Sequence, residues 1–444
     1  HNSSRNKHHP FLKFGDRKCR GFEQSFFRPV IDQLLSSLSR ITKVLLKYSK
    51  RDTLFFHFIE AKKHKIWVSM PIINRIADYF DEMQAWRHHM HSHPELGFDC
   101  FETAKFVKSK LEQFGVDKIY TEIARTGIVA IISGKSTGKT IGLRADMDAL
   151  PLEEATSKDY KSIKTGLMHA CGHDGHTTML LGAAKYLCET RNFSGSVALI
   201  FQPAEEGGGG AKVMCEEGIM DRFQIDEVYG IHNDPGSPLG FFQTCIGPNM
   251  AAADDFTIKI LGRGGHAAEP EETIDPLMTG VQIVQAIQTI SSRNLSALER
   301  VVISITQFHA GVTHNIIPNE AFINGTVRTL SKGAQCLVVK RLQELCQGHG
   351  LGFGGKIKLD YNYGYPATVN HQRETRFAAD VAKEIVGVQN VDINAKPIMA
   401  SEDFSYMIEE RPGCYFHVGQ GVGVPVHNPE YDFNDDLSPI GASF

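Results

Sequence analysis

The sequence predicts an α/β protein in which a mainly parallel sheet, covered by helices, is interrupted by a smaller inserted α+β domain. Short apolar runs rich in β-branched residues alternate with helical stretches before residue 247 and again after residue 363, as in a parallel sheet with helical crossovers. Between these positions the order changes to strand, helix, strand, strand, helix, strand, which is typical of a ferredoxin-like fold. We therefore expect one α/β domain, formed by residues 70–247 and 364–444, to be split by an insert of residues 248–363.

Apolar spacing predicts the elements of the first α/β part. Apolar residues at helical spacing indicate one helix over 71–93, ended by Pro94, and a second over 102–114. Four apolar runs indicate strands, and a further helix over 176–190 separates the second run from the third. These runs cover residues 128–132, 141–143, 197–201 and 228–231.

The insert begins with an alternating pattern. Phe256, Ile258 and Ile260 alternate with polar residues, as in a strand with one buried face. The later elements of the insert are expected to be a helix over 276–292, strands over 301–307 and 321–328, and a helix over 334–346. The second α/β part is expected to contain a helix over 374–386 and a strand over 414–418. No final helix is expected before Phe444, so we expect the C-terminus to be incomplete.

Length, composition and charge exclude some classes of function. The chain has 444 residues, 42% of them hydrophobic and 22% charged, which is ordinary for an enzyme of two or three domains. No apolar run approaches the ~18–20 residues that a membrane span requires. With 47 basic and 51 acidic residues, the net charge gives no argument for a nucleic-acid partner. The nine scattered cysteines predict free thiols and a cytoplasmic location.

The first 69 residues differ from the rest of the chain. They hold 15 Lys or Arg and five Asp or Glu, whereas residues 70–444 hold 32 and 46. The segment is basic, but it is too long and too rich in acidic residues to make a good transit peptide. The first methionine is Met70, and organised sequence begins just after it. We expect residues 1–69 to be non-native upstream sequence or a disordered segment.

The strongest chemical signal is the run Met168-His169-Ala170-Cys171-Gly172-His173-Asp174-Gly175-His176. Cys171 and His173 are two residues apart, and in an extended segment they would point to the same side. Thiolate and imidazole are the usual ligands of zinc and similar metals, and Asp174 is suited to orient a ligand from behind. The alternative is a group of hydrogen-bonding residues at the start of a helix.

Metal-type ligands also follow several of the predicted strands. Glu205 and Glu206 follow the strand over 197–201, and a glutamate beside a metal site is suited to general-base work. Taken singly, each of these side chains has a structural interpretation, as part of a charged loop or as a structural histidine. The other members of this set are Asp146, Asp148, His232 and His427. Together they predict a metal cluster at the carboxyl edge of the sheet.

A series of motifs occurs in order between Met70 and Phe444. They are His91-Ser92-His93-Pro94-Glu95-Leu96-Gly97-Phe98, Arg144-Ala145-Asp146-Met147-Asp148-Ala149-Leu150-Pro151, the Cys171–His176 run, Pro203–Gly207, Gly264-Gly265-His266-Ala267-Ala268, Gly325–Thr329 and Ala400–Phe404. The set resembles the amidohydrolase family that includes hippurate hydrolase, N-acyl-amino-acid amidohydrolase and plant indole-acetyl-amino-acid hydrolases. The resemblance implies a metal-dependent, exopeptidase-like catalytic domain with an inserted lid or dimerisation domain. It also implies hydrolysis of N-acyl amino acids to a carboxylic acid and a free amino acid.

The resemblance further implies a role for each matching residue. Glu205 is expected to be the general base, and His266 to stabilise the oxyanion, often across a dimer. Asn315 and Arg328 are expected to contact the substrate, a small N-acyl amino acid. Two divalent ions per subunit (Mn²⁺, Zn²⁺ or Co²⁺) and a homodimer are expected. The implied metal ligands are Cys171, His173, Glu206, His232 and His427.

One departure from the family pattern bears on the substrate. After Ala268 the family usually continues with a small or aromatic residue and then Pro-His, whereas this sequence has Glu269-Pro270-Glu271. The substitution adds negative charge beside the expected pocket, so the acyl preference stays open. Alternative functions are an N-acetyl-diaminopimelate deacetylase, an aminobenzoyl-glutamate-type hydrolase and a catalytically silent metal-binding paralogue. A cysteine hydrolase with Cys171 as nucleophile is a further alternative, but nothing in the sequence marks an activated thiol.

Overall fold

An eight-stranded mixed sheet carries the candidate site in the computed structural model, which describes residues 73–444. The predicted upstream segment lies outside the described residues. In spatial order the strands are β1 (Lys118–Ile123), β2 (Gly127–Ser133), β4 (Ser194–Gln202), β3 (Ser136–Asp146), β5 (Glu227–Asp234), β16 (Gly413–Gly419), β6 (Phe242–Gln243) and β15 (Val391–Asp392). The central strands β4, β3, β5 and β16 run parallel, so the mainly parallel core is confirmed. The pairs β1–β2, β2–β4 and β16–β6 are antiparallel, and the edge pair β6–β15 is parallel.

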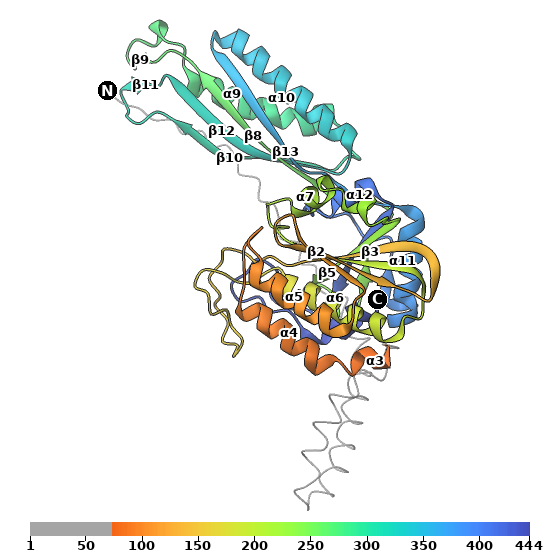
Figure 1. Ribbon diagram of the computed structural model, residues 1–444. Coiled ribbons are helices and arrows are strands. Elements are labelled where there is room, and N and C mark those ends of the chain that lie inside the picture. The colour runs from red at the N-terminus through yellow and green to blue at the C-terminus, as the bar shows by residue number, and fades with distance from the viewer. Residues whose placement is uncertain (1–72) are drawn as a thin grey trace, which may run out of the picture. The chain divides into compact units, whose positions relative to one another are not determined.

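Helices cover both faces of this sheet (Figure 1). On β2, Ile128 packs in a buried cluster with Leu111 and Leu181, whereas its neighbour Val129 packs with Met214 on the other face. Because successive residues of a strand point to opposite faces, β2 is apolar throughout its middle. The first face carries α4 (Phe80–Ser92), α5 (Phe101–Phe114) and α6 (His173–Thr190), and the second carries α7 (Gly210–Glu216), α8 (Ile219–Arg222) and α12 (Ser405–Glu410).

Two expectations about helices are wrong. The helix expected over 71–93 is interrupted after α3 (Asn74–Ala77), because the chain turns at Asp78 and Tyr79 and buries the Tyr79 ring before α4 begins. A final helix is also present: α13 (Ser438–Ser443) packs against α6 near the sheet. A Ser-Pro pair opens this helix, and Pro is favoured at that position because its missing N–H has no partner there.

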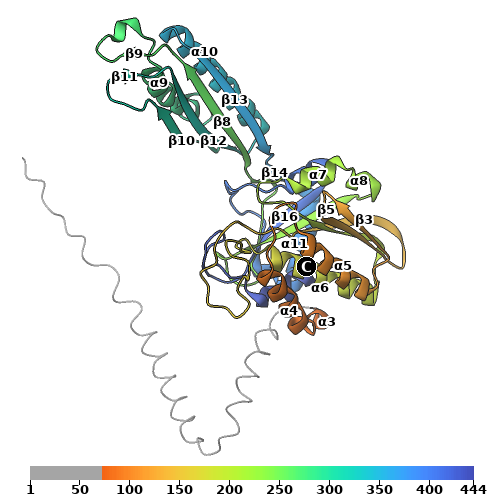
Figure 2. The ribbon, with the colours of Figure 1, turned by 60° about the vertical axis from the view of Figure 1, so that its left-hand side comes forward.

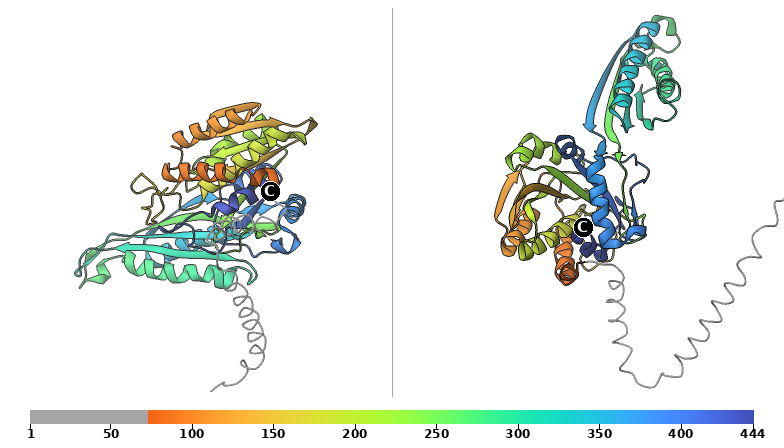
Figure 3. Two further views of the ribbon diagram at one scale, coloured as in Figure 1. Left: turned by 90° about the horizontal axis from the view of Figure 1, so that it is seen from below. Right: turned by 90° about the vertical axis from the view of Figure 1, so that its right-hand side faces the viewer.

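The insert contains a separate antiparallel sheet with helices on one face. In spatial order the sheet is β10 (Val301–Ala310), β12 (Glu320–Thr329), β8 (Ala252–Leu261) and β13 (Lys356–Tyr365). The helices α9 (Pro276–Thr289) and α10 (Lys332–Phe353) lie together on one face (Figures 2 and 3), where Ile258 and Ile260 pack with Ile283 and Leu342. The predicted ferredoxin-like order is present, although the limits of the insert at residues 248 and 363 stay a prediction.

Short elements complete the described chain. The strands β7 (Gly247–Met250) and β14 (Thr368–Asn370) pair with each other, as do β9 (Gly265–His266) and β11 (Ile316–Ile317). The remaining helix is α11 (Gln372–Val386). Across residues 73–444, none of the helices combines the length and the apolar character that crossing a membrane demands.

Candidate active site

Six of the predicted site residues come together at the carboxyl ends of β4 and β5. Their potential ligand atoms form overlapping groups within which all distances are at most 4.8 Å. Cys171 belongs to two groups, one with His173 and His232 and the other with Glu206 and His427. The third group is His173, Glu205 and Glu206. The overlap brings soft and hard ligands to one place, which suits transition-metal ions.

Cys171 and His173 reach the cluster by a route that differs from the expectation. The segment is not extended: Gly172 adopts a left-handed backbone (φ 93°) and His173 is the first residue of α6. A side chain at position 172 would also collide with Asn233 Oδ1 and the Tyr431 hydroxyl. Glycine is therefore required here by both conformation and space. The tight turn before the helix is what directs both neighbouring side chains to the same side.

Backbone carbonyls orient two histidines of the cluster, the buried His173 and the partly buried His232. His173 Nδ1 lies 2.8 Å from the carbonyl oxygen of Asp148, and His232 Nδ1 lies 2.7 Å from that of Asn233. A carbonyl only accepts, so each Nδ1 carries the proton and each Nε2 is free to bind a metal. His173 Nε2 is fully buried and has no hydrogen-bond partner among the described residues. His232 Nε2 lies 3.4 Å from Cys171 Sγ. An orphaned buried nitrogen of this kind fits a metal ligand.

Glu205 and Glu206 are held in a tight loop after β4. The Asp148 carboxylate accepts hydrogen bonds from the backbone N–H of Glu205 (3.0 Å) and of Glu206 (3.1 Å). Ala204, just before them, has a left-handed backbone with φ 56°, a conformation that costs free energy for a non-glycine residue. Glu206 Oε1 lies 3.1 Å from His427 Nε2. The loop thus presents two adjacent carboxylates to different neighbours.

Burial and neighbouring charges shift the pKa of several groups. The pKa of Glu205 lies well above its usual value because of burial and of the nearby Glu402 and Asp403 carboxylates. Burial likewise raises the pKa of the Cys171 thiol. The hydrogen bond to Glu206 raises the pKa of His427. A carboxylate with a raised pKa accepts a proton readily near neutral pH, which is the property a general base needs.

A buried ionic network lies behind Glu205, and of its members only Asp146 was given a role from the sequence. The Arg144 guanidinium contacts Asp146 Oδ2, Glu402 Oε1 and Asp403 Oδ1, each at 2.9 Å. Oxygens of Glu402 and Asp403 also lie within 4.8 Å of Glu205. Arg144 and the Glu402-Asp403 pair each belong to a family motif, over Arg144–Pro151 and Ala400–Phe404. Only the fold brings residues 144 and 402–403 together.

His266 and Asn315 lie away from the cluster within this chain. His266 is exposed on β9, where it pairs with Ile316, next to Asn315. Ala253, at the start of β8, lines the cavity at the cluster, whereas β9 follows the other end of that strand. The ten residues of β8 span about 30 Å at ~3.3 Å per residue. A single chain therefore does not bring His266 to the predicted metal ligands.

A cavity of about 840 Å³ opens at the cluster. Its walls include Cys171, Glu205 and His232 from the larger sheet region and Asp255 and Arg328 from the insert. His417, opposite His232 on β16, also lines it and was missed in the sequence. Arg328 Nη1 lies 3.0 Å from Ser401 Oγ. The cavity thus combines residues of the ligand cluster, the Glu205 carboxylate and the Arg328 cation.

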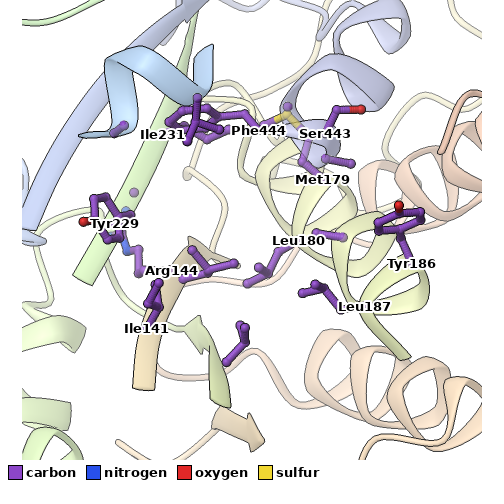
Figure 4. Close-up of a pocket in the computed structure, with 18 of the residues that line it drawn as sticks. Ile141, Arg144, Met179, Leu180, Tyr186, Leu187, Tyr229, Ile231, Ser443 and Phe444 are labelled. Carbon is purple, nitrogen blue, oxygen red and sulfur yellow. The ribbon is translucent and has the colours of Figure 1, made fainter. Parts of the chain in front are cut away.

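A second cavity, of about 320 Å³, is lined mostly by apolar side chains of α6, α11, α13 and the sheet (Figure 4). Leu180, Leu187 and Phe444 are among its walls. None of the predicted metal ligands or substrate-contact residues lines it. The chemistry of the chain is therefore expected in the first cavity.

The fold and the cluster are those of a metal-dependent hydrolase of the α/β class, and comparison with known proteins identifies the family. Residues 142–444 match the peptidase family M20/M25/M40, and the chain belongs to this family. It is 43% identical to the hippurate hydrolase of Campylobacter jejuni over 84% of this chain and 97% of that protein. It is 38% identical to the N-acetyl-L-cysteine deacetylase of Bacillus subtilis over 81% of this chain and 85% of that protein.

The solved structure of YxeP from Bacillus subtilis, described as a dinuclear metal binding peptidase of the M20 family, superposes on this chain with a TM-score of 0.74. It is 31% identical, over 83% of this chain and 96% of YxeP. The family resemblance, the fold class and the assignment as a hydrolase that were predicted from the sequence are thereby confirmed.

Proposed function

We propose that this chain is a metal-dependent amidohydrolase that cleaves the amide bond of N-acyl amino acids of the hippurate type. The products are a carboxylic acid and a free amino acid. The observation that carries the proposal is the presence of the ligand cluster, the buried Glu205 and the cationic Arg328 in one cavity. The names of the hippurate hydrolase and deacetylase relatives support the same bond type.

Two divalent ions are the cofactor we assign to the cluster. Cys171, His173, Glu206, His232 and His427 would hold the two ions. The free Nε2 atom of His173 supports this assignment. The native ion is Mn²⁺, Zn²⁺ or Co²⁺, all of which accept imidazole, carboxylate and thiolate ligands. The dinuclear description of YxeP agrees with two ions.

The chain's own residues supply proton transfer and orientation. When bound, divalent ions polarise the amide carbonyl and lower the pKa of water. Glu205 takes the proton from the attacking water and delivers it to the nitrogen of the leaving amine. The guanidinium of Arg328 pairs with the carboxylate of the amino-acid part, because planar guanidinium groups bind carboxylates in bidentate fashion. Asn315 contributes a further polar contact to the substrate.

We propose that His266 and Asn315 act in a homodimer, from the partner subunit. Backbone N–H of Ala268 donates to His266 Nδ1 at 3.1 Å, so Nε2 carries the proton and is available to stabilise an oxyanion. β10 is an edge strand with unpaired backbone groups among the described residues, and such an edge is suited to pair with a second copy.

The free thiols of all eight described cysteines agree with the proposed cytoplasmic location.

The first prediction concerns metal dependence. Hydrolysis of N-benzoylglycine is expected to be lost after chelation and restored by Mn²⁺, Zn²⁺ or Co²⁺, because Glu205 alone cannot activate water sufficiently. The measurement is amino-acid release from a panel of N-acyl amino acids, N-acetyl-diaminopimelate, aminobenzoyl-glutamate and an unblocked dipeptide. Chelator-resistant turnover, or a folded and metal-loaded protein that cleaves none of the panel, would refute the proposal.

The second prediction concerns the dimer. Glu205→Gln and His266→Ala variants are each expected to be nearly inactive, yet mixing them should restore about a quarter of the wild-type activity. In a mixed dimer one site combines the intact Glu205 of one subunit with the intact His266 of the other. Subunit exchange followed by a rate assay checks this. No recovery in a mixture that demonstrably forms mixed dimers would show that His266 does not act from the partner.

A further inference from the structure

Tyr365 is the last residue of β13, and its side chain leaves the insert's sheet to contact the loop that carries Glu205. We propose that Tyr365 is a positioning residue that fixes the backbone of Glu205 and so keeps the carboxylate in the geometry of a general base. This inference rests on the proposed function, in which Glu205 is that base. Sequence motifs gave no sign of it, since Tyr365 lies outside all of them.

The Tyr365 hydroxyl both donates and accepts a hydrogen bond. It donates a hydrogen bond to the backbone carbonyl of Glu205 at 2.6 Å and accepts one from the N–H of Gly209 at 2.9 Å. The two partners flank the loop, so one hydroxyl bridges its beginning and its end. Burial and the nearby Asp403 and Glu205 carboxylates raise the pKa of Tyr365 well above its usual value. The hydroxyl therefore keeps the proton that it donates.

Hydrogen bonds hold the backbone of Glu205 at both its N–H and its carbonyl. Asp148 holds its N–H and Tyr365 holds its carbonyl, while Ala204 immediately before it has a left-handed backbone. A non-glycine residue stays in this region only where surrounding contacts fix it. Asp148 fixes the amide side, so the carbonyl side depends on Tyr365 and on the turn bond from Gly207 N–H (2.7 Å). Removing the hydroxyl leaves the Glu205 carbonyl with the Gly207 bond alone and takes the acceptor from Gly209 N–H, while Asp148 still holds the N–H of Glu206. The Glu205 loop is then held less firmly on its carbonyl side.

The phenol ring itself is fixed by the insert and by α12. The backbone of Tyr365 pairs with Ala253 in the insert's sheet, and Gly364 N–H donates to the buried Asp254 carboxylate at 3.2 Å. The Tyr406 ring meets the Tyr365 ring edge-on, with the ring centroids 6.1 Å apart, a contact that does not involve the Tyr406 hydroxyl. Because Tyr365 belongs to β13, its hydroxyl ties the loop that carries Glu205 to the insert's sheet.

The test compares Tyr365→Phe with Tyr406→Phe in the metal-loaded, full chain. Each variant removes one hydroxyl from a partly buried ring, but the Tyr406 hydroxyl bonds the Gly364 carbonyl and does not touch the Glu205 loop. For Tyr365→Phe we expect kcat to fall about 10–100-fold, because small displacements of a reacting group are costly. KM is expected to change less than about threefold and metal content not at all, since Phe still packs and the ligands are untouched. For Tyr406→Phe, kcat is expected to stay within about twofold of the wild type.

Amide hydrogen exchange gives a readout that does not depend on turnover. In Tyr365→Phe, the peptide covering residues 204–211 is expected to exchange about tenfold faster, because Gly209 N–H loses its acceptor. In Tyr406→Phe this peptide should exchange as in the wild type. Wild-type kcat together with wild-type exchange in Tyr365→Phe would overturn the inference, as would an equal loss in both variants. A wild-type protein inactive on all substrates would refute the proposed function instead, while exchange would still decide whether Tyr365 holds the loop.

Discussion

Glu205→Gln is expected to lower kcat by about 10²–10⁴-fold, the usual contribution of a positioned general base. Glutamine has nearly the shape of glutamate, but its amide does not accept a proton from water. Glu205 lies in the cavity with its backbone held by Asp148, so the substitution leaves the loop in place. Metal content, measured by elemental analysis, is expected to stay near two ions per subunit, and KM is expected to change little.

Two matched substitutions separate the base from the ligand. Glu206→Gln removes a carboxylate that contacts His427, so it is expected to lower both the metal content and the activity. Glu153→Gln, at an exposed position that does not line the cavity at the cluster, is expected to behave as the wild type. Turnover in Glu205→Gln within about tenfold of the wild type, with both ions bound, would show that another group takes the proton.

Local patterns were sufficient where a residue's role depends on its neighbours in sequence. The run over 128–132 predicted β2 because both faces of that strand are buried, by α5 and α6 on one side and α7 on the other. The alternation around Phe256 predicted β8 because only one face of the insert's sheet meets helices. The strand ends at residues 205, 206 and 232 predicted the ligand cluster, since the carboxyl ends of parallel strands meet at one edge.

Local patterns were insufficient where the fold brings distant residues together. The spacing of Cys171 and His173 suggested an extended segment, whereas a left-handed glycine and a helix start produce the same convergence. Tyr365 reads as an ordinary strand residue, and only the pairing of β13 beside the loop of Glu205 gives it a role. His266 is exposed on β9, away from the cluster within one chain. Its expected role across a dimer came from the family resemblance and not from a local pattern.

Arg144→Met is expected to lower the free energy of unfolding by about 3–5 kcal/mol, the usual cost of breaking a buried ion pair by removing one partner. Arg144 is almost wholly buried and contacts Asp146, Glu402 and Asp403, so methionine leaves several carboxylates buried without a cation. Urea unfolding measures the loss, and Arg75→Met, at a half-exposed pair with Glu189, should leave the midpoint unchanged. If Arg144→Met yields too little folded protein, Asp403→Asn added to it should recover stability, because it removes one of the stranded charges. A midpoint equal to that of Arg75→Met, or no recovery in the double variant, would mean that the network does not stabilise the fold through its charges.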